Sequence, residues 1–147
     1  QKNYIFSGLL IGLGTQIAAG LLYLPLKLIF DNLDVSEPAR ELVDKATGFG
    51  VFLLFLVVVV GAPLVEELFF RGLTLKAFEK KMSSRLALLL SSLFFAIAHL
   101  QLIQFPALFL FGLVAGYLVK KYDRLGRAVW AHVGFNATTV VALLLQG

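Results

Sequence analysis

Long apolar segments take up most of this sequence, and short polar segments separate them. A helix needs roughly 20 apolar residues to cross the hydrocarbon of a bilayer, and the 147 residues contain about five segments of that kind. With 59% hydrophobic and 15% charged residues, the chain has too few polar side chains to cover a water-soluble globule. We therefore predict an all-α fold, a polytopic transmembrane helix bundle integral to the membrane.

The apolar pattern predicts one membrane domain over residues 1–147 with about five spans. These spans are residues 4–30, 49–80, 85–104, 106–121 and 125–146, and residues 31–48 form a polar loop after the first. A break is expected near Pro63, because proline frees a backbone carbonyl and bends a helix. Cysteine is absent, which excludes thiol nucleophiles and disulfides.

The polar connections differ in charge. Residues 31–45 hold five acids and two bases, residues 71–85 hold five bases and one acid, and residues 120–127 hold four bases and one acid. The positive-inside rule places the two basic connections in the cytoplasm. In a five-span alternation the acidic loop then lies on the opposite side, and the amino terminus lies inside.

Two pairs of glycines are spaced for close helix packing. Gly8 and Gly12, and likewise Gly112 and Gly116, stand four residues apart within apolar segments. Packing inside one bundle is the favoured interpretation, and a dimer remains possible.

Ionisable side chains within apolar spans are costly, and they tend to face an interior cavity with a partner. The few in this chain are Glu66, Glu67 and Arg71 in the second span, His99 in the third, and His132 in the fifth, where Asn136 follows. Glu67 and Arg71 stand four residues apart in the favourable acid-before-base order. This pairing leaves Glu66 as the unpaired carboxylate, although a structural ion network of all three residues is an alternative.

The two histidines each share a helical face with another residue of the pattern. His99 follows Phe95 by four residues, and Asn136 follows His132 by four. At roughly 1.5 Å per residue from the basic connections, Glu66, His99 and His132 lie about 8 to 21 Å from the cytoplasmic boundary. We therefore expect them to meet in a cavity that opens to the cytoplasmic side.

Three motifs occur in order on successive hydrophobic segments: EELFFR at Glu66–Arg71, FAIAH at Phe95–His99 and HVGFN at His132–Asn136. Together they resemble the CPBP family of type II CAAX prenyl endopeptidases and bacteriocin-processing enzymes, whose pattern is EExxxR, FxxxH, then HxxxN or HxxxD. The resemblance covers about half the chain, and the first 60 residues carry no motif. It implies a CAAX-protease-like core.

The resemblance also implies roles for these side chains. Glu66 and His99 would activate a water molecule, and His132 and Asn136 would stabilise the tetrahedral intermediate. Glu67 and Arg71 would be structural, and Phe95 would be a supporting residue. Residue chemistry agrees, because peptide hydrolysis needs a base for the water and donors aimed at the developing oxyanion.

A zinc-dependent mechanism is the alternative chemistry. Glu66, His99 and His132 are suitable ligand types for a catalytic zinc with one open position, and members of the resembled family have been described as metalloenzymes. A metal-free mechanism is favoured, because the sequence contains no histidine pair four residues apart and reveals no carboxylate behind a histidine.

The predicted function is therefore that of an intramembrane endopeptidase. A non-catalytic membrane binding or bacteriocin-immunity protein on the same fold is the alternative. A proton-coupled transporter fits less well, because inverted repeats would give a matched second break. The expected partners are membrane lipid and a peptide or protein substrate, whose carboxy terminus carries a lipid in relatives that cleave CAAX tails, and no nucleic acid.

Overall fold

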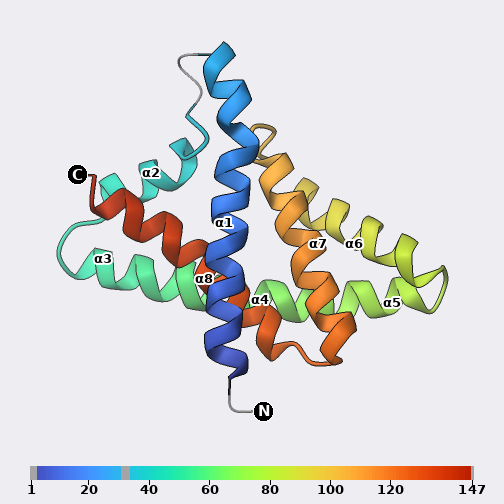
Figure 1. Ribbon diagram of the computed structural model, residues 1–147. Coiled ribbons are helices and arrows are strands. Elements are labelled where there is room, and N and C mark those ends of the chain that lie inside the picture. The colour runs from blue at the N-terminus through green and yellow to red at the C-terminus, as the bar shows by residue number, and fades with distance from the viewer. Residues whose placement is uncertain (1–2, 31–33, 147) are drawn as a thin grey trace.

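The computed structural model describes residues 3–30 and 34–146, and within these ranges every regular element is a helix (Figure 1). Three helices are long and apolar enough to cross a membrane: α1 (Tyr4–Ile29), the continuous helix Phe49–Glu79, and α7 (Phe105–Tyr122). The others are α2 (Glu37–Lys45), α6 (Ser84–Ala98) and α8 (Gly126–Leu144). The all-α membrane bundle is confirmed, whereas the number of spans stays a prediction. Residues 31–33 of the expected polar loop, and the terminal residues 1–2 and 147 of the expected domain, lie outside the described residues.

The second apolar segment passes through Pro63 as one helix. It consists of α3 (Phe49–Leu54), the π-helical η1 (Phe55–Gly61), α4 (Ala62–Glu67), the π-helical η2 (Leu68–Leu75) and α5 (Lys76–Glu79). Near Pro63, where a break is expected, the helix is not interrupted. Its backbone hydrogen bonding changes instead from the π-helical pattern of η1 to the α-helical pattern of α4. Pro63 lies in the first turn of α4, directly after the wider turns of η1.

The third apolar segment ends earlier than its composition suggests. The expected span reached residue 104, but α6 ends at Ala98 and His99 is its C-cap. Leu100 adopts a left-handed backbone conformation with φ of 55°, which turns the chain away from the helix axis. This turn brings His99 to the end of α6 and leads into α7.

One end of the bundle gathers the basic connections, and we call it the basic end. Lys120, near the end of α7, donates to the Ser84 carbonyl at 2.7 Å. Lys76 of α5 approaches Asp123 to 3.8 Å. The ring of Tyr4 lies beside Gly126, so the start of α1 lies at the same end.

The opposite end contains the end of α1, residues 34–45 and the turn between α6 and α7, and we call it the acidic end. The Tyr23 hydroxyl donates to the Ile103 carbonyl at 2.6 Å. The Gln104 side-chain amide donates to the Val35 carbonyl at 2.7 Å. These two bonds join three segments that are distant in sequence.

Both glycine pairs are used inside the bundle, as favoured. A Cβ at Gly12 would overlap the Ala131 carbonyl and lie 2.7 Å from the Phe135 backbone nitrogen, so α1 and α8 touch backbone to backbone. A Cβ at Gly112 would lie 3.0 Å from that of Ser92 on α6. The small residues therefore set the distances between helices that surround the site described below.

We predict that Gly12→Ala destabilises the protein by about 1 to 3 kcal/mol, because α1 must move away from α8 to admit the methyl group. Gly14→Ala is the matched control, since no atom lies within 4 Å of its added Cβ. Thermal unfolding of both variants in detergent measures the difference. Equal melting temperatures would show that the α1–α8 contact tolerates a wider spacing.

Candidate active site

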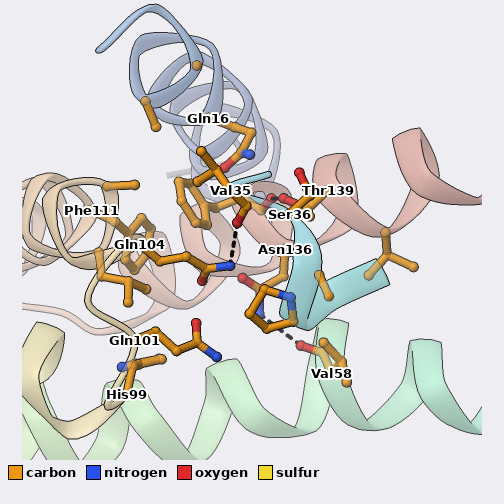
Figure 2. Close-up of a pocket in the computed structure, with 18 of the residues that line it drawn as sticks. Gln16, Val35, Ser36, Val58, His99, Gln101, Gln104, Phe111, Asn136 and Thr139 are labelled. Carbon is orange, nitrogen blue, oxygen red and sulfur yellow. Dashed lines mark hydrogen bonds between the residues drawn. The ribbon is translucent and has the colours of Figure 1, made fainter. Parts of the chain in front are cut away.

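A cavity of about 370 Å³ lies where α1, α4, α8 and the turn after α6 meet, and residues 35–42 form one of its walls. Figure 2 shows polar side chains from several of these elements around it. All four predicted catalytic residues line this cavity: Glu66, His99, His132 and Asn136. Helices far apart in sequence thus bring the predicted residues together.

Glu66 lies between the two histidines. Its Oε2 is 3.7 Å from His99 Nε2 and 3.8 Å from His132 Nε2, and it is buried without a hydrogen-bond partner among the described residues. Both distances exceed that of a direct hydrogen bond. Glu66 itself is partly open to the cavity, with 28% of its side chain exposed. Three polar atoms therefore face one small volume.

The other ring nitrogen of each histidine, Nδ1, already has a hydrogen-bond partner. His99 Nδ1 is 2.8 Å from the Phe95 carbonyl, and because a carbonyl only accepts, Nδ1 carries the hydrogen. His132 Nδ1 is 2.8 Å from Glu67 Oε1, so it donates to that carboxylate. In the neutral form each ring therefore presents an Nε2 lone pair toward Glu66.

Glu67 is completely buried and interacts with two partners through the same oxygen. Arg71 donates to Glu67 Oε1 at 2.8 Å, the pairing that the four-residue spacing predicts. Arg71 also donates to the Gly112 carbonyl at 3.3 Å, and its guanidinium stacks 4.3 Å from the centre of the Phe95 ring. The contact between Glu67 and His132 joins positions 65 residues apart, and no local spacing reveals it.

Asn136 contacts the irregular part of the second helix. Its Nδ2 donates to the Val58 carbonyl at 2.9 Å, as Figure 2 shows. In a π-helical pattern the carbonyl of residue 58 would accept from the N–H of residue 63, five positions later. Pro63 has no N–H, so Asn136 supplies the missing donor and ties α8 to η1.

The cavity lies toward the acidic end. Its lining includes Tyr23, Lys27, Val35 and Gln104, all from that end, and none of the charged residues of the basic connections. Lys27 is exposed and marks the rim. The side of the membrane on which the cavity opens, and the depth of these residues in the membrane, stay predictions.

Residues of α1 line the cavity although this segment carries no motif. Gln16, Tyr23 and Lys27 recur on one side of the helix, seven and four residues apart, and all three line the cavity. The sequence could have indicated these three residues as part of the site, because they are polar side chains within an apolar span.

Metal-ligand types are present, and the distances from Glu66 Oε2 to the two histidine Nε2 atoms, 3.7 and 3.8 Å, compare with roughly 3.3 Å between two ligand atoms of a tetrahedral zinc ion. Within residues 3–30 and 34–146, no three His, Asp or Glu side chains are close enough to hold one metal ion. A carboxylate does stand behind His132, namely that of Glu67. The lack of a carboxylate behind a histidine was one of the two sequence arguments against a metal, and this argument therefore does not hold.

Comparison with known families identifies the segment that contains these residues. The model of the type II CAAX prenyl endopeptidase Rce1-like family matches residues 48–138, which is more than half of the chain and includes all three motifs. No curated protein and no solved structure gives a significant match. The resemblance to CAAX endopeptidases of the CPBP group is thereby confirmed, and the chain belongs to the Rce1-like family of type II CAAX prenyl endopeptidases.

Proposed function

We propose that this protein is an intramembrane endopeptidase in which Glu66 activates a water molecule for attack on a peptide bond. The convergence of Glu66 Oε2 and two histidine Nε2 atoms on one volume carries this proposal. A substrate water placed about 2.8 Å from both Oε2 and an Nε2 bridges a separation of this size. It donates one hydrogen to Glu66 and the other to His99.

The reaction begins with proton transfer from this water to the Glu66 carboxylate. The resulting hydroxide adds to the carbonyl carbon of the scissile bond and gives a tetrahedral oxyanion. When the carbon–nitrogen bond breaks, Glu66 returns the proton to the departing amine nitrogen. The carboxylate is thus regenerated, and the products are a carboxylic acid and an amine.

His132 and Asn136 serve the oxyanion in this proposal. One N–H of the Asn136 amide is bonded to Val58, and the amide has a second N–H for the oxyanion. The protonated form of His132 donates through Nε2, while Glu67 holds its ring from the other side. Donors fixed before the reaction stabilise the transition state without reorganisation.

Glu67 and Arg71 act as supporting residues. Arg71 balances the charge of Glu67, and Glu67 orients the His132 ring. A carboxylate behind a histidine fixes its tautomer. The pair therefore supports the site and does not touch the reacting atoms.

The proposal contains no metal, and no step depends on one. Glu66, His99 and His132 are the side chains that would hold a zinc ion, and zinc would lower the pKa of a bound water. We further propose that the substrate is a peptide at the membrane, and the family name points to a prenylated carboxy-terminal tail.

A chelator experiment tests this chemistry. We expect purified protein that has been dialysed extensively against a strong chelator to cleave prenylated and unmodified reporter peptides at an unchanged rate. Metal analysis should give far less than one equivalent of zinc per chain. If the chelator abolishes cleavage and added zinc restores it, the three side chains are zinc ligands instead. If no preparation cleaves either peptide, the enzyme function is contradicted.

A further inference from the structure

Gln16 differs from other polar side chains of α1 in its hydrogen bonding. Ser7, Thr15 and Tyr23 each donate their hydroxyl to a backbone carbonyl of the protein. The Oε1 atom of Gln16 is buried and accepts no hydrogen bond from any residue that the structure describes. A buried acceptor that lacks a donor is costly. Gln16 is therefore a side chain that packing of the bundle alone does not explain.

The fold places Gln16 beside the proposed oxyanion residues. Gln16 follows Gly12 by four residues, about one helical turn, and therefore lies on the same side of α1. At Gly12 the backbones of α1 and α8 touch, beside the segment of α8 that carries His132 and Asn136. Gln16 lines the same cavity as these two residues, and Figure 2 shows it on the side of the cavity opposite His99. A peptide that crosses this cavity passes next to Gln16.

Given the proposed peptidase function, we infer that Gln16 is a positioning residue whose Oε1 accepts a hydrogen bond from a backbone N–H of the substrate near the scissile bond. An extended peptide has backbone donors along both of its edges, so a segment beside α1 directs one of them at this acceptor. The bond involves the backbone and no substrate side chain. It therefore favours an extended segment with an unsubstituted N–H at one fixed position, whatever its sequence.

Backbone N-methylation tests this hydrogen bond directly, because the methyl group replaces the hydrogen that Gln16 accepts. Fluorescent reporter peptides, each N-methylated at a different residue, are titrated against the Glu66→Gln protein, so that binding is measured without cleavage. We expect methylation at one position to weaken binding about tenfold or more, since the buried acceptor then lacks a donor. The double variant Glu66→Gln with Gln16→Met should bind the unmethylated peptide about as weakly. Methylation at that position should then have no further effect.

Two other glutamines provide matched controls. Gln146 is exposed and does not line the cavity, so Gln146→Met should leave peptide binding unchanged. Gln104 lines the cavity, but its amide donates to the Val35 carbonyl, so Gln104→Met should lower the unfolding temperature. Gln16→Met should not lower it, because no described residue donates to Gln16 Oε1. A structural residue and a substrate-binding residue are thereby separated.

Kinetics of the single variant complete the test. Gln16→Met should raise KM for the reporter peptide about tenfold with little change in kcat, since the bond is made equally in the bound substrate and in the transition state. The inference is overturned if KM and the effect of methylation are unchanged, or if the unfolding temperature falls as in Gln104→Met. Cleavage with an unchanged KM refutes the role of Gln16 alone. The expected binding pattern in a protein that cleaves no peptide refutes the peptidase function alone, and a protein that neither binds nor cleaves contradicts both.

Discussion

Glu66→Gln is expected to slow peptide cleavage at least about a hundredfold while the protein still folds and inserts. Loss of a general base costs roughly 10² to 10⁴ in rate, and the amide that replaces the carboxylate cannot take a proton from water. The fold should be unaffected, because Glu66 Oε2 has no hydrogen-bond partner among the described residues and glutamine has nearly the same size. Cleavage of reporter peptides in vesicles measures the rate, and thermal unfolding measures the stability.

Glu37→Gln is the matched control for this variant. Glu37 lies on α2, is exposed, and does not line the cavity, so the same chemical change there should leave the rate of cleavage unaltered. Cleavage by Glu66→Gln at the rate of the unmodified protein would contradict the assignment of Glu66 as the base. A large loss in both variants would point to a general effect of surface charge on assembly.

Features that depend on local spacing could be predicted from the sequence. The apolar segments gave the helical membrane fold, because length and composition alone decide whether a helix can cross a bilayer. The pairing of Glu67 with Arg71 followed from their four-residue separation on one helix face. The four-residue spacing of the glycine pairs likewise predicted close helix packing. It did not indicate that the partner helices are α8 and α6.

Features that depend on contacts between distant segments could not be predicted. The bond from His132 to Glu67 joins α8 to α4, and the bond from Asn136 to Val58 depends on a π-helical turn before Pro63. Neither hydropathy nor the spacing of residues within one helix determines how two distant helices align with each other. The crossing of α1 over α8, at which Gly12 meets Ala131, is a contact of the same kind (Figure 1).

The irregular helix Phe49–Glu79 carries both glutamates and accepts the hydrogen bond from Asn136. Two π-helical stretches flank α4, which carries both glutamates. A π-type turn rotates the residues that follow it relative to an ideal α-helix. The turns of η1 therefore help to set the directions of Glu66 toward the cavity and of Glu67 toward Arg71, and Asn136 holds η1 in place. Such irregular turns are frequent at functional sites.

Glu67→Gln is expected to act mainly on stability, in contrast to the same change one residue earlier. Glu67 is fully buried, and Arg71 is only 1% exposed. Glutamine keeps the size of the side chain but removes its charge, which leaves the Arg71 cation buried without its counter-ion. Breaking a buried pair by neutralising one partner costs about 3 to 5 kcal/mol, so a substantially lower unfolding temperature in detergent is the predicted result.

The double variant Glu67→Gln with Arg71→Met separates charge from packing. If the uncompensated cation causes the loss, removing it as well should recover much of the stability, and the two effects should be strongly non-additive. The recovered double variant should still cleave poorly, because His132 has lost the carboxylate that orients its ring. If Glu67→Gln unfolds at the temperature of the unmodified protein but is inactive, the two glutamates have been assigned the wrong way round. Glu67 would then be the base, and Glu66 would be the supporting residue.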